Sequence, residues 1–583
     1  MQGWNVLSSN EEMAEMVIER ASEYGVNHLQ LSHQVIMDLR HAKNSKRAAM
    51  VNRLTQKAHG AGIDEVLVWD HALYTLDYYP AAFRSGPDSL INLDNPEFWR
   101  WIKNDYRQML SLLPEIDGVV LTFIETGAHV EDQYSEILKT EEEKLAAMVD
   151  SLASVIIDER GLQLYVRTFT YNHAELTSMM KCLELIKNEK IRVMEKEVPH
   201  DFFLTHPVAK HVKDIRFPTI IEFDAAHEYN GQGIIASIFP ELHLQRWNYY
   251  KQFPNVIGYV ARTDRFNNTS ILHQNPAELN LFALNQGFAQ DVSPDSLYQE
   301  FVQKYYGQEA VDQLVPAFRM SHSIIQSVFY TLGLNTNSHS RLQYDDNSAY
   351  QRHVSAKWME EPVIKLENGI DKEFHYWKDI VNHLAPAWYK KSEGTQLARE
   401  SPWVIEKGWL EPVELMDETY LRYVLEEKNY GVKQSEEALK LVQEAKTFVI
   451  DQENYDSLLH IYERTLFTSE LYEATAKLYF GYRVYARGPE FRTDYVKQAL
   501  KEGMIDAKRI AEEMLQYPHT GPIGQFEWQE DAYRALAYYN AVTNRATDEY
   551  TPDTFPSFPY QGLSQQEREK IRTEAVKNEI FDF

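Results

Sequence analysis

Cysteine is almost absent from this chain: Cys182 is the single one in 583 residues. An intrachain disulfide is therefore excluded, and so is a zinc site built from several cysteines. No apolar run reaches the length of a membrane-spanning helix. The N-terminal residues MQGWNVLSSNEEMAE also lack the basic segment followed by an apolar one that marks a signal peptide. We expect a cytoplasmic protein, or a periplasmic one if a signal peptide has been removed, with no membrane partner.

Positive charge is the second deficit. The chain has 59 Lys and Arg against 87 Asp and Glu, which gives a formal net charge of -28 at pH 7. Such a surface repels nucleic acid and anionic membranes, so neither is expected as a partner. A small anionic substrate remains compatible with this charge, because a local basic pocket can form in an acidic protein.

Several signatures of catalysis are also missing. No glycine-rich phosphate loop follows an apolar run, and no G-x-S-x-G motif is present. His227-Glu228 is followed by Tyr-Asn-Gly, so the HEXXH zinc motif is absent, and no His-x-His ends a predicted strand. We expect neither a catalytic metal nor a cofactor.

What the first part of the chain does contain is a regular alternation of apolar runs and amphipathic segments. Eight such units, each of about 25–35 residues, are the rhythm of a (β/α)₈ TIM barrel. A doubly wound open sheet is the alternative, weakened by the missing phosphate loop. The predicted strands are 4–8, 28–32, 65–69, 118–123, 163–169, 191–194, 219–223 and 256–261. The predicted helices between them are 10–24, 44–59, 96–113, 140–158, 174–188 and 242–253.

The pattern changes after about residue 275, where long helical stretches dominate. We therefore predict a catalytic barrel over 1–275 and a mostly helical region over 276–583, with a Trp/His/Tyr-rich section at about 339–411 that could cap the barrel. The helical region could form a homodimer or an intramolecular core. Its predicted helices are 294–306, 309–332, 360–384, 417–427, 435–451, 455–486 and 494–517, and 551–561 is expected to be irregular.

The ends of the predicted strands carry the polar groups that a barrel enzyme places at its catalytic face. Glycoside hydrolysis needs one protonated carboxyl group and one ionised carboxylate, and Glu125, Asp201 and Glu228 follow strands four, six and seven. Each of these could instead cap a helix or pair with a basic residue. The further candidates for substrate binding are Trp69, His71, Arg167, Tyr171, Lys196, His200, His227, Tyr229 and Arg262.

Two local motifs, EFDAAHEYNGQ at 222–232 and KEVPHDF at 196–202, resemble the α-glucuronidases of glycoside hydrolase family 67. ETG at 125–127, VRTFTY at 166–171 and the segment 275–288 followed by Ser293-Pro294 are similar as well. The resemblance runs over about 118–294. It implies a TIM barrel with a C-terminal helical domain and inversion of configuration at the sugar.

By this resemblance Glu125 is the general acid, Asp201 and Glu228 hold and activate the attacking water, and Arg167 and Lys196 bind a uronate carboxylate. A further lysine of the family's carboxylate clamp corresponds to Leu121, and His227 replaces its usual glutamine. The N-terminal β-rich domain of the family has no counterpart before the first strand. These departures make an altered substrate an alternative: another uronic acid, a different glucuronide or a neutral sugar.

The sequence thus predicts an exo-acting, inverting glycosidase that removes a uronic acid or a related sugar from an oligosaccharide. A general acid needs a raised pKa, so Glu125 is expected to be partly desolvated. The alternatives are a non-catalytic carbohydrate-binding barrel, and a lyase or metal-dependent barrel enzyme that acts on sugar acids.

Overall fold

The computed structural model describes residues 1–86, 88–171, 173–199, 201–204, 208–265, 270–272, 274–331, 334–344, 417–544, 555–556, 558–581 and 583. His200, the predicted helix 360–384 and most of the predicted Trp/His/Tyr-rich section lie outside these residues.

Eight parallel strands close into a barrel in the order β1-β10-β9-β8-β7-β6-β3-β2. The predicted (β/α)₈ fold is confirmed, and the open-sheet alternative is wrong because β1 pairs with both β2 and β10. All eight predicted strands are present, with ends shifted by no more than a few residues. They are β1 (Gln2–Val6), β2 (His28–Leu31), β3 (Glu65–His71), β6 (Gly118–Thr122), β7 (Gln163–Arg167), β8 (Arg192–Lys196), β9 (Thr219–Phe223) and β10 (Val256–Arg262).

Alternate residues of each strand face the barrel interior, as the two-residue period of a strand requires. The interior is a separate apolar cluster, while the intervening side chains join the larger core between strands and helices. Polar residues follow the apolar ones at the carboxyl ends of the strands, so the packed interior forms the floor of the barrel mouth. The inner cluster is Leu67, Trp69, Val120, Tyr165, Met194, Ile220 and Val260.

Helices cover the outside of the barrel, and several begin at capping residues visible in the sequence. Asn10, Asn44 and Asn95 accept backbone hydrogen bonds at the starts of α1 (Glu11–Glu23), α2 (Ser45–Gly60) and α3 (Pro96–Ser111). A short 3₁₀ turn, η5 (Lys210–Asp214), replaces a helix between β8 and β9. The remaining helices are α4 (Glu141–Ala153), α5 (His173–Leu185), α6 (Pro240–Tyr250) and α7 (Glu278–Gly287).

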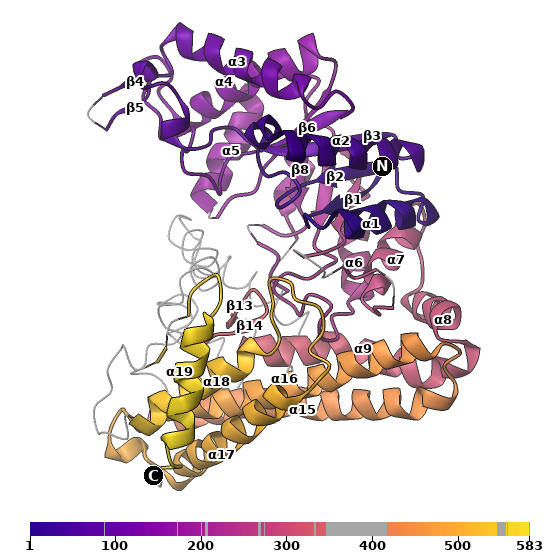
Figure 1. Ribbon diagram of the computed structural model, residues 1–583, viewed down its shortest axis with the longest axis vertical. Helices are drawn as coiled ribbons and strands as arrows, with labels where there is room; N and C mark the ends of the chain where they lie inside the picture. Colours follow the sequence, from indigo (N-terminus) through magenta and orange to yellow (C-terminus); the bar gives the residue numbers. More distant parts are fainter. Residues whose placement is uncertain are drawn as a thin grey trace.

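Long helices form the C-terminal region, which lies beside the barrel in Figure 1. The two predicted helices 417–427 and 435–451 are wrong as separate elements, because α15 runs unbroken through Gly431. Gly431 lets α15 approach α9, since an added Cβ would lie 3.1 Å from Ser327 Cβ. Sequence analysis missed α18 and α19. The elements are α8 (Pro294–Tyr305), α9 (Val311–Phe329), α15 (Glu418–Glu444), α16 (Gln452–Tyr485), α17 (Asp494–Gln516), α18 (Glu530–Asn544) and α19 (Gln565–Lys577).

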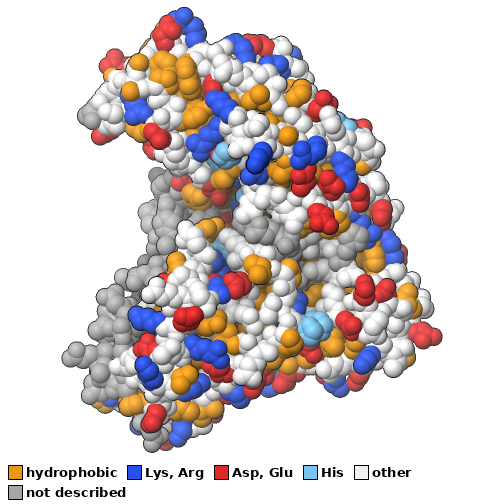
Figure 2. All heavy atoms as spheres, in the orientation of Figure 1, with side chains coloured by type: hydrophobic (Ala, Val, Ile, Leu, Met, Phe, Trp, Pro, Cys, Tyr) orange, Lys and Arg blue, Asp and Glu red, His pale blue; other side chains and the backbone are white. Residues whose placement is uncertain are grey.

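A small hairpin, β13 (Asn337–Ser338) with β14 (Arg341–Leu342), lies between the barrel and the long helices (Figure 1). The molecular surface is hollowed between these two parts (Figure 2). Over the residues that the structure describes, no helix is long and apolar enough to cross a membrane.

Candidate active site

The floor of the barrel mouth holds Arg167 in a fixed position. Trp69 of β3, 2% exposed, donates its indole N–H to Gln30 Oε1 at 3.0 Å. The Arg167 guanidinium carbon lies 4.6 Å from the centre of the Trp69 ring and 4.8 Å from that of Phe169. This sandwich of rings restricts the rotamers of Arg167 and adds cation–π attraction. Trp69, predicted to bind substrate, thus packs against Arg167 and helps to hold it in place.

Glu222 joins the two arginines of the mouth. Its Oε2 accepts from Arg167 Nε at 2.9 Å and lies 2.8 Å from Arg167 Nη2. Its Oε1 accepts from Arg262 Nε at 3.0 Å and lies 2.9 Å from Arg262 Nη2. Burial alone would raise the pKa of Glu222, but Arg167 and Arg262 lower it below its usual value. Glu222 therefore stays ionised and sets the spacing of the two guanidinium groups.

Glu228 is held by two further cationic contacts. Its Oε2 accepts from Arg262 Nη1 at 2.9 Å, and its Oε1 accepts from Arg265 Nη2. His339 Nε2, from the C-terminal hairpin, lies 3.3 Å from the same Oε1. The pKa of Glu228 is well below its usual value, because Arg265, His339 and Arg262 outweigh the effect of burial. A proton on this carboxylate is strongly disfavoured.

Asp201 contacts Lys196, a backbone N–H and a tyrosine hydroxyl among the described residues. Its Oδ1 accepts from Lys196 Nζ at 2.7 Å and from the backbone N–H of Phe202 at 3.0 Å, and its Oδ2 accepts from the Tyr229 hydroxyl at 2.7 Å. Burial lowers the pKa of Lys196, and Asp201 offsets part of that effect. Lys196 Nζ also lies 3.4 Å from the centre of the Phe169 ring.

Glu125 differs from the other carboxylates because its side chain is 37% exposed. Among the described residues, the cation that pairs with it is Arg167 Nη1, 4.0 Å from Oε2, which is beyond hydrogen-bond distance. The adjacent Thr126 hydroxyl donates to the carbonyls of Leu73 and Tyr74, which ties this loop to the one after β3. The side chain of Glu125, which was expected to be partly desolvated, is therefore much more exposed to solvent than those of Asp201, Glu222 and Glu228.

Four buried polar atoms of the mouth have no hydrogen-bond partner within the described residues: Asn5 Nδ2, His71 Nε2, Thr122 Oγ1 and Arg167 Nη1. They come from β1, β3, β6 and β7, and His71 is the register partner of Thr122. His71 Nδ1 lies 2.7 Å from Asp38 Oδ1, which fixes the ring and leaves Nε2 for another partner. Buried polar groups are normally satisfied, so these atoms indicate a place for water or a polar ligand.

Strained backbone gathers in the same place. Among non-glycine residues with positive φ, His33, Glu125, His227, Gln232, His339 and Ser340 all lie in loops around the mouth. Side-chain-bearing residues rarely adopt this conformation, and such strain concentrates at functional sites. Glu125 itself has φ 66°.

Two sequence-based expectations need correction. His227 does not face the mouth: its Nε2 lies 3.1 Å from His243 Nε2 of α6, and the ring packs edge-on against Phe239. Leu121 belongs to the outer core, whereas its neighbour Val120 belongs to the inner cluster. Position 121 thus points away from the mouth, so the leucine there says nothing about a missing cation in the site.

Tyr229, predicted to bind substrate, is 1% exposed and instead donates to Asp201. Burial raises the pKa of the Tyr171 hydroxyl, and the negative charges of Glu125 and Asp201 raise it further. Arg262, predicted to bind substrate, donates hydrogen bonds to Glu222 and Glu228.

Asp38, Arg265 and His339 were not among the predicted site residues. Arg265 follows the eighth strand, so its position was a usable signal. His339 begins the Trp/His/Tyr-rich section that was expected to cap the barrel, but no local pattern paired it with Glu228, more than 100 residues earlier in the sequence. Within the described ranges, no group of three His, Cys, Asp or Glu side chains is arranged to hold a metal ion.

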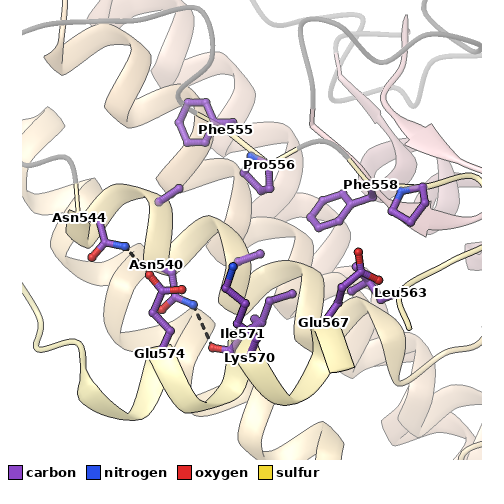
Figure 3. Close-up of a pocket in the computed structure, with 13 residues that line it drawn as sticks. Asn540, Asn544, Phe555, Pro556, Phe558, Leu563, Glu567, Lys570, Ile571 and Glu574 are labelled. Atoms are coloured by element: carbon purple, nitrogen blue, oxygen red, sulfur yellow. Dashed lines mark hydrogen bonds between the residues drawn. The ribbon is translucent and has the colours of Figure 1, made fainter. Parts of the chain in front are cut away.

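A cavity of about 430 Å³ lies between α18, α19 and the side chains of Phe555, Pro556, Phe558, Pro559 and Leu563 (Figure 3). Its amides are engaged in structural bonds: Asn544 Nδ2 donates to Glu574 Oε1 at 2.5 Å and Asn540 Nδ2 to the Ile571 carbonyl at 3.0 Å (Figure 3). These contacts hold α19 against α18, which indicates a structural role for the polar groups of this cavity. The candidate active site is therefore the barrel mouth.

No protein-family model and no curated protein sequence matches the chain. Solved structures similar to it include BtGH115A, a family GH115 4-O-methyl-α-glucuronidase, at 12% identity and a TM-score of 0.44, which covers 95% of this chain and 59% of that one. CpGH84D matches at 9% identity and a TM-score of 0.41, over 87% and 68% of the two chains. The chitobiase FjGH20 of Flavobacterium johnsoniae matches at 10% identity and a TM-score of 0.33, over 87% and 75%. Matches this distant carry no information on the chemistry of this chain's site.

Proposed function

We propose that this protein is an exo-acting, inverting glycoside hydrolase that removes a uronic acid or a related acidic sugar from an oligosaccharide. The observation that carries the proposal is the difference between the carboxylates at one barrel mouth. Asp201 and Glu228 are buried and bonded to cations, whereas Glu125 has no Lys or Arg within hydrogen-bond distance among the described residues. Inverting hydrolysis needs this asymmetry, with one carboxyl that can carry a proton and one that stays ionised.

Glu125 is the proposed general acid. Within the described part of the chain no Lys or Arg is hydrogen-bonded to its carboxyl, and its strained backbone holds it at the rim of the mouth. A bound sugar would cover the exposed part of the side chain. Loss of water around the side chain disfavours a charged carboxylate, which suits a group that must deliver a proton.

Asp201 is the proposed base, with Glu228 beside it on the water side. The guanidinium groups of Arg262 and Arg265 can only donate hydrogen bonds, so a proton on Glu228 would break a favourable contact. The Tyr229 hydroxyl that contacts Asp201 can either donate or accept, so it accommodates both protonation states of this carboxylate. Asp201 can therefore take a proton from water at less cost than Glu228.

Arg167 is the proposed contact for the anionic group of the sugar. Its Nε and Nη2 are occupied by Glu222, but its buried Nη1 has no hydrogen-bond partner among the described residues. A charge-assisted hydrogen bond from a guanidinium to a carboxylate is among the strongest that a site of this kind offers. The unpartnered atoms of Asn5, His71 and Thr122 face the same space and suit sugar hydroxyls.

A screen of uronic-acid-substituted oligosaccharides and aryl glycosiduronates, with the product anomers followed by NMR, tests the proposal. We expect release of an acidic sugar with inverted configuration. Retained configuration in the first-formed product would refute inversion. Binding of acidic sugars with no turnover on any of them would favour the non-catalytic carbohydrate-binding alternative.

The acid is tested by Glu125→Gln. Loss of general acid catalysis lowers kcat by about two to four orders of magnitude, while the sugar still binds because the amide keeps the shape of the side chain. An aryl substrate whose leaving group needs no proton should lose much less. Full activity of Glu125→Gln on an oligosaccharide would exclude Glu125 as the acid.

A further inference from the structure

The C-terminal region reaches into the barrel mouth through the β13–β14 hairpin. His339 and Ser340 form its two-residue tip, and both have left-handed backbone, with φ of 51° and 64°. Such a tip matches the twist of the paired strands and presents its side chains in a defined direction. The tip is directed at the loop after β9, which carries Glu228.

Hydrogen bonds fix the hairpin tip on that loop. The Ser340 hydroxyl donates to the Glu228 carbonyl at 2.9 Å and accepts from the Gly231 N–H at 2.8 Å. Asn337 Nδ2 donates to the Tyr229 carbonyl at 3.2 Å, and Asn337 Oδ1 accepts from the Ser340 N–H at 2.8 Å. Every residue of this contact is buried. The position of His339 relative to Glu228 is therefore set by several bonds at once.

His339 Nε2 lies between two groups of the proposed water side. It is 3.3 Å from Glu228 Oε1 and 3.4 Å from the Tyr229 hydroxyl oxygen, a long contact. Tyr229 in turn donates its proton to Asp201 Oδ2 at 2.7 Å. Since an ionised carboxylate can only accept, Nε2 must carry the imidazole proton. A continuous path of contacts thus runs from Glu228 through His339 and Tyr229 to Asp201.

Among the described residues, the groups that face His339 come from four parts of the chain. They are Glu228 and Tyr229 of the loop after β9, Arg265 of the loop after β10, Arg341 of β14, and Tyr560, whose ring packs edge-on at 4.9 Å. Burial lowers the pKa of His339, Glu228 raises it, and the two arginines lower it further. The ring is therefore neutral near pH 7, with its one proton on Nε2.

We propose that His339 is a positioning residue of the barrel's active site: its Nε2–H, delivered by the C-terminal hairpin, orients Glu228 and, through Tyr229, Asp201. The inference rests on the proposed function for its catalytic consequence, but the contact itself exists without substrate. It makes the C-terminal region part of the site, so the barrel by itself lacks one of the groups that hold the water-side carboxylates.

The contact is tested first without any substrate, by NMR of the full chain labelled with [¹⁵N]histidine. The ring-nitrogen shifts separate the Nδ1–H, Nε2–H and doubly protonated forms, and the His339 signals are those absent from His339→Gln. We expect a neutral Nε2–H ring near pH 7 whose shifts change in Glu228→Gln and in Tyr229→Phe. A ring in the Nδ1–H form, or one indifferent to both variants, would overturn the proposal.

The catalytic consequence is tested with an aryl glycosiduronate that the protein cleaves. His339→Ala should lower kcat/KM by about tenfold to a hundredfold, the range for a lost hydrogen bond to a charged group, and should move the acidic limb of the pH profile to higher pH. His339→Gln should recover most of the activity, because its amide places an N–H near the position of Nε2. His59→Ala is the control, since His59 pairs with Asp117 at the opposite end of the barrel.

An unchanged pH limb in His339→Ala, or equal losses in the Ala and Gln variants, would contradict the positioning role. The two proposals fail separately. The NMR result can hold while no glycoside is cleaved, which would reject the proposed function alone. Turnover with an indifferent His339 would reject the role of His339 alone.

Discussion

At the scale of single residues, the barrel mouth is an alternation of charges in which three buried carboxylates have cationic partners. Glu222 lies between Arg167 and Arg262, Glu228 between Arg262 and Arg265, and Asp201 against Lys196. A protein with a net charge of -28 thus concentrates cations at one interior point. The arginines keep Glu222 and Glu228 ionised, whereas Glu125 has no Lys or Arg within hydrogen-bond distance among the described residues.

Removing the charge of Glu222 tests how far this network supports the fold. Glu222→Gln leaves two buried guanidinium groups without their shared anion, and an uncompensated buried charge costs about 3–5 kcal/mol. We expect that loss in the free energy of unfolding, measured by urea denaturation at pH 7. The control is Glu11→Gln, which breaks the exposed pair with Arg53 and should cost less than about 1 kcal/mol. Equal effects of the two variants would contradict the structural role of Glu222.

Asp70 gives a residue-level prediction for pH. Asp70 belongs to β3, and its buried carboxyl accepts hydrogen bonds from the hydroxyls of Tyr74 and Tyr106 and from the Leu39 N–H. Burial raises its pKa from 3.8 to about 7. Between these two values the folded state holds a proton that the unfolded state has lost. Asp70 therefore stabilises the fold most at low pH, and this contribution falls as pH rises from about 4 to 7.

Asp70→Asn removes this titration. The difference in the free energy of unfolding, variant minus wild type, should increase by about 1.4 kcal/mol for each pH unit between about 4.5 and 6.5. Urea unfolding of both proteins at several pH values in this window measures the difference. Parallel curves would show that Asp70 is already ionised in the folded state.

At the scale of elements, close helix contacts decide where glycine is required. An added Cβ at Gly503 of α17 would lie 2.8 Å from Lys477 Cβ and 3.0 Å from the Ala474 carbonyl oxygen of α16. The backbone of α16 cannot move away without disturbing its own packing. Gly60, at the end of α2, has nothing within 4 Å of an added Cβ. The two glycines therefore have opposite expectations for the same substitution.

Gly503→Ala should destabilise the protein by about 1–3 kcal/mol, because overpacking outweighs the gain in helix propensity. Gly60→Ala should stabilise it by up to about 1 kcal/mol, because propensity acts there without a clash. Thermal unfolding of the two variants beside the wild type measures both. A stabilising Gly503→Ala would mean that α16 and α17 are less tightly packed than the structure shows.

At the scale of the whole molecule, the loop after β9 joins the barrel to the C-terminal region. The Ala236 N–H donates to the Thr465 hydroxyl at 2.9 Å, Arg464 Nε donates to the Ile234 carbonyl at 2.7 Å, and the Phe526 N–H donates to Gln232 Oε1 at 3.0 Å. With the hairpin contacts, these bonds satisfy a loop that is buried throughout. The barrel and the helical region therefore depend on each other for structure as well as for the site.

Residues 1–290 expressed alone are expected to lose this support. The loop would expose apolar side chains such as Ile234 and Phe239 together with unsatisfied backbone groups. We expect the truncated chain to aggregate, or to unfold well below the full chain in a thermal melt. A soluble, cooperatively folded barrel of equal stability would contradict this dependence. The full chain should unfold in one transition.

The amino-acid pattern was enough to predict the closed barrel and its strands, with Glu125, Asp201, Glu228, Arg167 and Lys196 at or just after the carboxyl ends of the strands. This was possible because a buried parallel strand can be recognised from a short stretch of sequence, as an apolar run followed by polar residues.

Only the tertiary structure decided which side chains meet. The direction of Leu121 into the outer core, the turn of His227 toward His243 and the pairing of Glu222 with two arginines depend on strand register and loop conformation, which local composition does not carry. The contact of His339 with Glu228 joins positions more than 100 residues apart, and it forms because a hairpin tip and a barrel loop are packed together by the helices beyond them. Such contacts follow from the packing of the whole molecule, which no single segment of the sequence specifies.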